Sequence, residues 1–383
     1  MSNPQSIIVL GSTGSIGTSC LDVIRSHPDR MRLHGAMANR SGEALGAQAA
    51  EFRPNWVMLA DESACLDSAA LPAETRFCAG DSELEQLIRS PDVDTVVSAV
   101  VGAAGLTSTW TAVDAGKRVA IANKESLVVA GPLIRKRRAE TSAEIFPVDS
   151  EHSAIFQALQ AGRKEDLRRI ILTASGGPFR GWSTAQMTQV TPEMALKHPT
   201  WQMGPKITVD SATMMNKALE IIEARWLFDV QPEQISVVVH PQSFIHSFVE
   251  YRDGSVISQM SPPDMRLPIQ YALTYPDRID CPCPDTDWTQ AATMELFPPD
   301  LDAFPALGLG FEVARMGGTT GAILNAANEV AVERFLNSEI RFDQITQVTQ
   351  QILNNHTFDA QPTMEDLQQS DNWARKEALR WNS

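Results

Sequence analysis

The chain has 383 residues, 43% hydrophobic and 21% charged, which predicts two or three domains with sizeable cores. Acidic residues outnumber basic ones by 47 to 32, and the net charge of -15 argues against nucleic acid or an anionic membrane as a partner. The five cysteines lack a metal-type spacing and indicate free thiols in a reducing compartment. Because no targeting segment precedes the apolar run at residues 7–10, and no apolar run reaches about 18 residues, the sequence predicts a cytoplasmic protein.

The first pattern in chain order is a short apolar strand at residues 6–10 followed by a glycine-rich turn and a helix start. The turn places Gly11, Gly14 and Gly17 at the spacing G-x-x-G-x-x-G. Backbone N–H groups at such a turn, together with the helix dipole, favour a bound phosphate. The commoner dinucleotide spacing is G-x-G-x-x-G, and a tight turn that needs glycine for packing is the alternative interpretation.

The second predicted strand, residues 32–38, bears on the choice of cofactor. An NAD-binding unit usually ends this strand with Asp or Glu, which binds the ribose hydroxyl. Here Asn39 and Arg40 follow the strand instead. An arginine without a carboxylate favours a 2′-phosphate and therefore NADPH, whereas a surface role for Arg40 is the alternative.

Strand and helix patterns then alternate, which predicts a doubly wound, Rossmann-like α/β domain over residues 1–148. The predicted elements occupy residues 56–60, 83–89, 95–101, 106–115, 118–122, 132–141 and 144–148. Small residues at 101–105 allow a cofactor to approach the backbone closely. Lys124 follows the strand 119–122, where its charge can neutralise a substrate anion; an ordinary ion pair with Glu125 is the alternative.

Two carboxylates, Asp149 and Glu151, follow the predicted strand 145–148. If the strand continues, residues two apart share a face, so both side chains point to the same side. Paired carboxylates at the carboxyl end of a parallel strand suit a hard divalent cation. The alternative is a helix N-terminus, with Ser150 as the cap and Glu151 in the first turn of a helix over residues 152–159.

A second domain with a catalytic role is predicted over residues 149–285. After the strand 169–174, Ser175 and two glycines offer hydroxyl and amide donors to an anion. The segment of about residues 180–204 lacks strong periodicity and is predicted to be a lid that closes over a ligand. Trp201 in this segment supports that hypothesis, although a tryptophan that anchors a surface loop is the alternative.

The helix predicted to start near Thr213 carries further polar residues. Asn216 and Glu220 are four apart and share a face, with Lys217 beside them and Ser211 near the helix N-terminus. Ser211, Asn216 and Lys217 therefore suit a phosphate, and Glu220 becomes a third carboxylate for the cation. The alternative is a surface ion pair between Lys217 and Glu220.

Three strands at residues 235–240, 243–251 and 255–260, the last two joined by a hairpin, predict an α+β domain with a mixed or antiparallel sheet. A flat apolar face on this sheet is a plausible seam of a homodimer. A linker is expected at residues 286–300, and helical periodicity predicts a small C-terminal helical domain at 301–383. Asn325, Asn328 and Glu329, polar at helical spacing, are interpreted as part of this supporting domain.

Together these motifs resemble the 1-deoxy-D-xylulose 5-phosphate reductoisomerase family. The resemblance spans nearly the whole chain and is carried, in order, by residues 11–17, 122–127, 147–152, 173–179, 198–204, 209–217, 220 and 240–243. It implies NADPH- and divalent-cation-dependent isomerisation and reduction of 1-deoxy-D-xylulose 5-phosphate to 2-C-methyl-D-erythritol 4-phosphate, in non-mevalonate isoprenoid synthesis. The cation is expected to be Mg²⁺ or Mn²⁺, with Co²⁺ as an alternative.

The resemblance also implies roles for individual residues. Metal ligands are expected at Asp149, Glu151 and Glu220, and catalytic roles at Lys124, Glu151 and His198. Substrate contacts are expected from Ser150, Ser175, His198, Trp201, Met203, Ser211, Asn216 and Lys217. Cofactor contacts are expected from Thr13, Gly14, Ser15, Ile16, Asn39, Arg40, Asn123 and Glu125.

Three other classes of protein account for part of the pattern, and one of them, a cofactor-free metal phosphatase, would fail to oxidise NADPH. An NADP-linked dehydrogenase of another kind explains the first domain but leaves the carboxylates and the Ser/Asn/Lys cluster without a role. A non-enzymatic nucleotide sensor needs neither the three carboxylates nor a lid. Besides the cofactor and the cation, the expected ligand is a small phosphorylated sugar, the substrate.

Overall fold

The structure is a computed structural model that describes residues 3–201 and 203–382. The chain divides into two compact units, each built from several segments. Unit 1 comprises Met1–Asn123, Ile134–Ser153 and Asp264–Pro284, and unit 2 comprises Lys124–Leu133, Ala154–Pro263 and Asp285–Ser383. The three-domain division expected from the sequence stays a prediction, and Gln202 of the expected lid lies outside the described residues.

Unit 1 is built on a seven-stranded sheet of order β4-β3-β2-β1-β5-β6-β7, in which every neighbouring pair is parallel. Its central strand β1 is apolar from Ile7 to Leu10, and all four side chains are fully buried. A strand buried on both faces is what a parallel sheet covered by helices requires. The doubly wound domain is confirmed. The strands are β1 (Gln5–Leu10), β2 (Met31–Ala38), β3 (Trp56–Leu59), β4 (Arg76–Cys78), β5 (Thr95–Ser98), β6 (Arg118–Ile121) and β7 (Glu144–Pro147).

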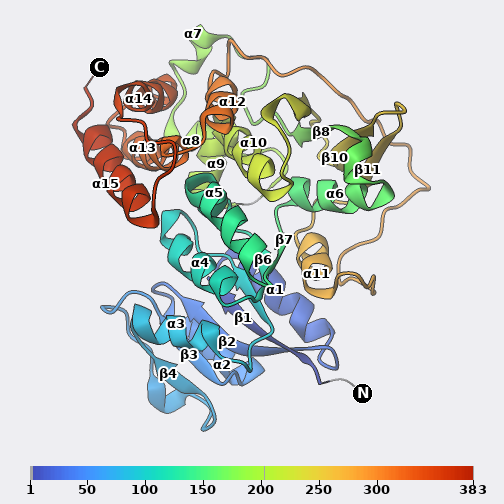
Figure 1. Ribbon diagram of the computed structural model, residues 1–383, viewed down its shortest axis with the longest axis vertical. Coiled ribbons are helices and arrows are strands. Elements are labelled where there is room, and N and C mark those ends of the chain that lie inside the picture. The colour runs from blue at the N-terminus through green and yellow to red at the C-terminus, as the bar shows by residue number, and fades with distance from the viewer. Residues whose placement is uncertain (1–2, 202, 383) are drawn as a thin grey trace. The chain divides into compact units, whose positions relative to one another are not determined.

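Helices connect these strands, as the alternating pattern predicts (Figure 1). Within unit 1 they are α1 (Ser15–Ser26), α2 (Gly42–Phe52), α3 (Asp81–Arg89) and α4 (Leu106–Asp114), whereas α11 (Arg266–Thr274) belongs to unit 1 but connects none of these strands. Helix α11 packs against α1 although about 240 residues separate them in the chain. Its apolar residues, among them Ile269 and Leu273, are buried and extend the core of unit 1.

Helix α5 (Lys124–Glu140) starts eight residues before the position that the sequence predicted. The backbone leaves helical geometry at Ala130, and Pro132 follows inside the helix. Proline lacks an N–H group and clashes with the preceding turn, so the helix kinks there. The predicted helix at 132–141 is therefore only the second half, and Lys124 and Glu125 lie in the first turn of α5 rather than in a loop.

The sequence prediction that Asp149 and Glu151 alternate along one strand is wrong. Strand β7 ends at Pro147, and helix α6 (Ser150–Ala158) begins two residues after Val148. The amide of Ser153 donates to the carbonyl of Asp149, which makes Asp149 the residue that starts the helix. The alternative interpretation, a helix N-terminus with Glu151 in its first turn, is confirmed, but its cap is wrong, because Ser150 is the first residue of α6 and not the residue before it.

Unit 2 contains a four-stranded mixed sheet of order β11-β10-β8-β9. Strands β8 (Leu167–Ala174) and β9 (Ile235–Val239) are parallel, whereas β10 (Ile245–Tyr251) is antiparallel to both β8 and β11 (Val256–Met260). The hairpin predicted between the last two strands is confirmed. His240 and His246 bond to the backbone carbonyls of Glu295 and Ser261, as expected of structural histidines.

The remaining helices of unit 2 surround a large apolar core. They are α7 (Thr184–Met187), α8 (Pro192–Ala195), α9 (Pro205–Ala212), α10 (Met215–Leu227), α12 (Ala306–Met316), α13 (Thr320–Leu336), α14 (Phe342–Asn355) and α15 (Met364–Arg380). Helices α10 and α12 lie side by side (Figure 1). Gly310 of α12 lies against the backbone of Ala218. Among the helices that the structure describes, none is long and apolar enough to cross a membrane.

One element boundary changes the setting of a predicted site residue. The sequence placed Ser211 before a helix, near its N-terminus. In the structure Ser211 lies in the last turn of α9, and the next helix starts only at Met215. The prediction is wrong because Pro205, which favours a helix start, opens a separate helix upstream.

Candidate active site

The glycine-rich turn of unit 1 has the geometry of a phosphate-binding loop. Gly11 has a φ of +86°, and a Cβ there would lie 2.4 Å from the carbonyl oxygen of Ala99. A Cβ at Gly17 would lie 2.3 Å from the Gly11 oxygen, so the helix packs directly on the turn. Helix α1 begins at Ser15 without a side-chain cap, which leaves its first N–H groups available to an anion. Thr13 and Gly14 belong to this turn, and Ser15 and Ile16 are the first two residues of α1.

Asn39 and Arg40 follow β2 and are exposed. The Arg40 Nε atom lies 2.5 Å from Oδ2 of Asp61, an ion pair in which the arginine side chain stays 75% exposed. Hydrogen bonds from Ser63 and Arg40 lower the pKa of Asp61 to about 2. Asp61, which follows β3, was not identified from the sequence. It holds Arg40 beside the end of β2, where a ribose phosphate binds in folds of this kind.

Asn123, at the end of β6, is buried and fixes the small-residue loop after β5. Its Nδ2 atom donates to the carbonyls of Val100 at 2.6 Å and Gly102 at 2.9 Å. A Cβ at Gly105 would lie 3.0 Å from the Asn123 side chain. The small residues at 101–105 are thus packed against Asn123 at the carboxyl edge of the sheet.

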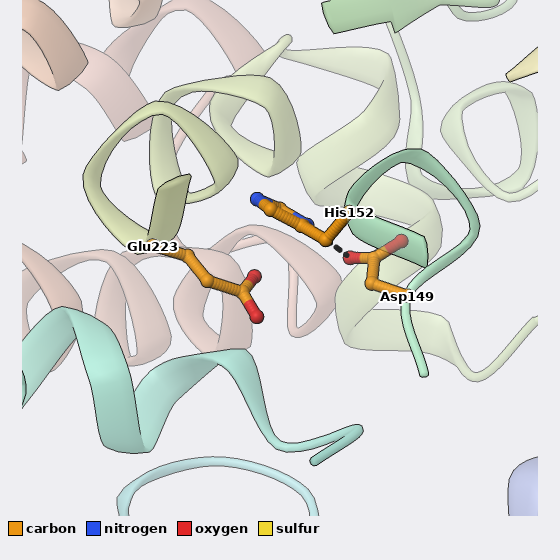
Figure 2. Close-up of side chains that lie close together, drawn as sticks. All are labelled: Asp149, His152 and Glu223. Atoms are coloured by element: carbon orange, nitrogen blue, oxygen red, sulfur yellow. Dashed lines mark ion pairs between the residues drawn. The ribbon is translucent and has the colours of Figure 1, made fainter. Parts of the chain in front are cut away.

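The turn between β7 and α6 gathers Asp149, Ser150, Glu151 and His152. The Ser150 hydroxyl lies 2.5 Å from Oε2 of Glu151. Figure 2 shows the Asp149 carboxylate directed to the His152 ring, with 3.9 Å between Oδ2 and Nδ1. The His152 side chain is fully buried, whereas that of Asp149 is 15% exposed. Two carboxylates therefore sit within one helical turn, on the rigid end of a buried strand.

Unit 2 brings three predicted residues together around Glu220, whose side chain is fully buried. The Lys124 Nζ atom lies 2.7 Å from Oδ1 of Asn216 and 3.4 Å from Oε1 of Glu220. Asn216 donates to the same Glu220 oxygen at 2.6 Å, and Lys217 pairs with the other oxygen. The alternative of a surface ion pair between Lys217 and Glu220 is wrong, because the Lys217 side chain is only 3% exposed.

The junction between α9 and α10 places the backbone of Ser211 against Gly177, in the turn that follows Ser175. Met214 adopts the left-handed conformation with a φ of +61°, which is uncommon for a side chain with a Cβ and often marks a functional site. The turn after β8 contains two glycines with positive φ, and a Cβ at Gly177 would lie 2.7 Å from the Ser211 carbonyl oxygen. The Ser175 turn therefore packs on the end of α9, beside the first turn of α10.

His198 bonds to Ser175 and has a defined tautomer. Its Nδ1 atom accepts from the amides of Thr200 at 3.1 Å and Trp201 at 2.9 Å. Because an accepting ring nitrogen carries no proton, the proton of the neutral ring lies on Nε2, 3.1 Å from the Ser175 hydroxyl. Burial lowers the pKa of His198, which favours this neutral form. His198 thus presents a single N–H donor next to Ser175.

The expected lid is partly ordered by packing. Its first half forms the short helices α7 and α8, and Met187, Val190 and Ala195 are buried in the core of unit 2. Phe179, just before it, packs edge to face against Phe342 of α14, with 5.2 Å between the ring centroids. Residues from His198 to Gly204 instead form irregular backbone in the part that the structure describes. Trp201 and Met203 lie there and are half-buried.

Most polar residues of these clusters were identified from the sequence, but Lys206 and Asp210 were not. Lys206 pairs with Glu125 at 3.0 Å and with Asp210 at 2.8 Å. Asn328 donates to Asp210 at 2.8 Å. The sequence feature that indicates this cluster is Lys206 itself. It is the second residue of a helix, where the helix dipole disfavours a positive charge.

Comparison with known families covers nearly the whole chain. Residues 7–131 match the model described as 1-deoxy-D-xylulose 5-phosphate reductoisomerase. Residues 145–228 match that of its C-terminal domain, and residues 260–377 match the DXP reductoisomerase C-terminal domain. The reductoisomerase of Chlorobium chlorochromatii is 50% identical over 98% of both chains. That of Rhodopirellula baltica is 48% identical over 97% of this chain and 94% of its own.

Solved structures agree with these matches. The fold is similar to that of DOX-P reductoisomerase in complex with NADPH, fosmidomycin and magnesium, with a TM-score of 0.92, 41% identity and 98% of both chains covered. It is equally similar to the Zymomonas mobilis 1-deoxy-D-xylulose 5-phosphate reductoisomerase in complex with NADPH, with a TM-score of 0.92, 43% identity and the same coverage. On its sequence and its fold, the chain belongs to the 1-deoxy-D-xylulose 5-phosphate reductoisomerase family.

Proposed function

We infer that the chain catalyses the reaction of its family, the NADPH- and divalent-cation-dependent conversion of 1-deoxy-D-xylulose 5-phosphate to 2-C-methyl-D-erythritol 4-phosphate. The observation that carries this inference is the cluster of Lys124, Asn216, Lys217 and Glu220, which combines two cations, an amide and a buried carboxylate at the start of α10. A dehydrogenase that only moves a hydride does not need such a cluster.

The proposed cation ligands are Asp149, Glu151 and Glu220. Each offers a carboxylate oxygen, and a donor set made only of such oxygens fits Mg²⁺ or Mn²⁺. When bound, the cation supplies Lewis acidity towards the carbonyl and hydroxyl oxygens of the substrate. The rigid start of α6 holds Asp149 and Glu151, and the buried start of α10 holds Glu220.

Lys124 is proposed to act at the reacting end of the substrate. Its ammonium lies 2.7 Å from Oδ1 of Asn216 and 3.4 Å from Oε1 of Glu220, so two side chains of α10 orient it. A fixed ammonium stabilises negative charge that develops on a substrate oxygen and delivers a proton at that position. Glu151, next to the Ser150 hydroxyl, is proposed to hold a substrate hydroxyl proton in the same region.

The substrate phosphate is proposed to bind at Ser175, Ser211, Asn216 and Lys217. The first amides of α10, the Ser175 turn and the Lys217 ammonium all favour a dianion there. His198 adds its Nε2–H donor from the lid side. Ser150, Trp201 and Met203 are proposed to contact the substrate's carbon backbone, and closure of residues 198–204 excludes water from it.

NADPH is proposed to lie along the carboxyl edge of the sheet of unit 1 and to supply the hydride. Thr13, Gly14, Ser15 and Ile16 hold its phosphates at the uncapped start of α1. Asn39 and Arg40 receive the ribose 2′-phosphate, and Asn123 and Glu125 flank the nicotinamide end. Arg40 supports the preference for NADPH over NADH, because its guanidinium is exposed yet held by Asp61.

We further propose a cytoplasmic homodimer. The five cysteines are free, which suits a reducing compartment. Strand β11 is an edge of the sheet in unit 2, and its apolar residues Val256, Ile257 and Met260 are 51%, 36% and 41% exposed. An exposed apolar edge strand is a pairing surface that a second copy can cover. Sedimentation of the wild type and of Val256→Lys tests this: a dimer that V256K turns into a monomer is expected, and a wild-type monomer refutes it.

The function is tested by the loss of NADPH absorbance on addition of 1-deoxy-D-xylulose 5-phosphate. Turnover with Mg²⁺ or Mn²⁺ that stops on addition of a chelator is expected. A folded protein that binds NADPH but does not turn over this substrate would refute the assignment of the substrate while leaving the cofactor site in place.

A further inference from the structure

Lys206 occupies a position that local helix energetics disfavour. It is the second residue of α9, where the helix dipole repels a positive charge. Its pair with Asp210 runs from lysine to acid along the helix, the less favourable direction for an i,i+4 pair. The side chain is nevertheless only 18% exposed. Tertiary contacts therefore hold this lysine in place.

Those contacts are two carboxylates on different elements. The Nζ atom lies 3.0 Å from Oε1 of Glu125 and 2.8 Å from Oδ2 of Asp210. The side chains of Glu125 and Asp210 are 9% and 1% exposed. Burial lowers the pKa of Lys206, but the charges of Asp210 and Glu125 raise it more, so the ammonium stays protonated. One buried cation thus joins α5 to α9.

Both ends of this bridge lead to predicted site residues. Glu125 directly follows Lys124 in the first turn of α5, and Lys124 reaches Asn216 and Glu220. Lys206 lies two residues after Gly204, where the expected lid ends and α9 begins. A shift of the first turn of α5 moves Lys124, and a shift of the start of α9 moves the end of the lid.

The far side of the bridge is anchored in the C-terminal helices. Asn328 of α13, fully buried, donates to Oδ1 of Asp210 at 2.8 Å. One residue on, Glu329 accepts from Asn325 at 3.1 Å and pairs with Arg375 of α15 at 2.5 Å. These polar residues on α13 therefore form a layer of fixed charges and dipoles behind α9. Asp210 cannot rotate away from Lys206 without losing its hydrogen bond from Asn328.

We propose that Lys206 is a positioning residue for the reaction: its ammonium locks the first turn of α5, which carries Lys124, to the start of α9, which ends the lid. It acts through Glu125 and Asp210 and does not touch the substrate. This role rests on the proposed function, in which Lys124 works at the reacting end of the substrate.

The first test compares steady-state kinetics of Lys206→Met and Lys206→Arg with the wild type. Misplacement of a catalytic group by about 1 Å costs up to about 100-fold, so K206M is expected to lower kcat by about 10- to 100-fold with a much smaller change in KM for the sugar phosphate. K206R keeps the charge and is expected to recover most of kcat. Lys164→Met, which breaks an exposed pair with Asp229, is the matched control and is expected to keep the wild-type kcat.

A second variant separates positioning from stability, since K206M leaves two buried carboxylates without their shared ammonium. The triple variant K206M/E125Q/D210N removes all three charges, while the amide that D210N introduces keeps an acceptor for Asn328. It is expected to regain thermal stability but not kcat. If the triple variant regains both, Lys206 is only a structural ion-pair partner and the proposal is overturned.

Hydrogen–deuterium exchange supplies a readout that does not depend on turnover. Peptides covering the starts of α5 and α9 are expected to exchange faster in K206M than in K206R, K164M and the wild type. Unchanged exchange at both helix starts would overturn the proposal that Lys206 fixes the start of α5 to the start of α9. A wild type without turnover would refute the proposed function alone, because the exchange comparison still reports on the bridge.

Discussion

The Nζ atom of Lys124 lies 2.7 Å from the Oδ1 atom of Asn216, although 92 positions separate them in the chain. This bond joins the first turn of α5 to the first turn of α10. Both helix starts are buried in unit 2, and Glu220 accepts from both residues. Lys124, the proposed catalytic lysine, and the proposed phosphate site are thus fixed by a single buried network.

Removing the Glu220 carboxylate is expected to slow turnover and to weaken its dependence on the cation. Glu220→Gln keeps the size of the side chain but removes a hard ligand and the partner of two lysines. A fall in kcat of at least about 100-fold, with weaker dependence on Mg²⁺, is expected from NADPH absorbance. Glu233→Gln, at an exposed glutamate paired with Arg315, serves as the control with unchanged kcat. Equal losses in both variants would contradict the role of Glu220.

The buried imidazole of His198 predicts a pH dependence of stability. Burial lowers its pKa below the ordinary value of 6.5, so the unfolded chain binds the proton more readily than the folded one. The contribution of the neutral ring to the free energy of unfolding is complete above pH 6.5. It decreases as the pH falls from 6.5 towards the lower pKa of His198 in the folded state. The difference in melting temperature between the wild type and His198→Gln is expected to shrink from pH 7.5 to pH 5.5. A constant difference would refute this assignment.

Two glycines of α12 predict opposite effects on stability. A Cβ at Gly310 would lie 2.6 Å from the Cα atom of Ala218, so Gly310→Ala forces α12 away from α10 and is expected to cost about 1–3 kcal/mol. A Cβ at Gly308 meets nothing within 4 Å, so Gly308→Ala is expected to stabilise the helix by up to about 1 kcal/mol. Chemical denaturation measures both. A loss in G308A equal to that in G310A would show that packing on Ala218 is not the cause.

Arg40 is expected to control the preference between the two nicotinamide cofactors. Arg40→Ala removes a charge-assisted hydrogen bond to a 2′-phosphate, worth about 1.5–3 kcal/mol, so KM for NADPH should rise at least about 10-fold. The KM for NADH, which lacks this phosphate, should not change. Arg53→Ala, which breaks another exposed pair in unit 1, is the control. An equal rise for both cofactors would place Arg40 away from the phosphate.

The close packing of Gly17 on the glycine-rich turn predicts a loss of cofactor binding. A Cβ at Gly17 would lie 2.3 Å from backbone, so Gly17→Ala must displace α1 from the turn. Fluorescence titration is expected to show NADPH affinity weakened by about 10-fold or more. Gly46→Ala on α2, where a Cβ meets only Leu66 at 3.5 Å, should bind as the wild type does. Normal binding by G17A would contradict the proposed phosphate cradle.

Much of the fold follows from patterns in the sequence. The apolar run of β1, the alternating elements of unit 1 and the helical periodicity after residue 301 predicted the parallel sheet and helices α12, α13 and α14. Weak patterns were missed for physical reasons. Strand β4 has three residues, two of them exposed, and α15 buries little beyond Leu367, Ala374 and Ala378. Elements of this kind are stabilised by their neighbours rather than by their own periodicity.

The boundaries around the site were harder to predict than its residues. Local patterns placed Asp149 and Glu151 on a strand, whereas the chain turns into α6 after Val148. They also placed Ser211 ahead of a helix, because the left-handed Met214 that separates α9 from α10 has no sequence signature. Lys206 was not identified, since its two partners, Glu125 and Asp210, come together only in the folded unit.

The most direct test of the function is the carbon skeleton of the product. ¹³C-labelled 1-deoxy-D-xylulose 5-phosphate is incubated with the protein, NADPH and Mg²⁺, and the product is analysed by NMR. We expect a branched tetrol phosphate, with the label pattern of a rearranged skeleton and one NADPH consumed per product. A straight-chain polyol phosphate, formed by reduction without rearrangement, would contradict the proposed function and identify a simple dehydrogenase.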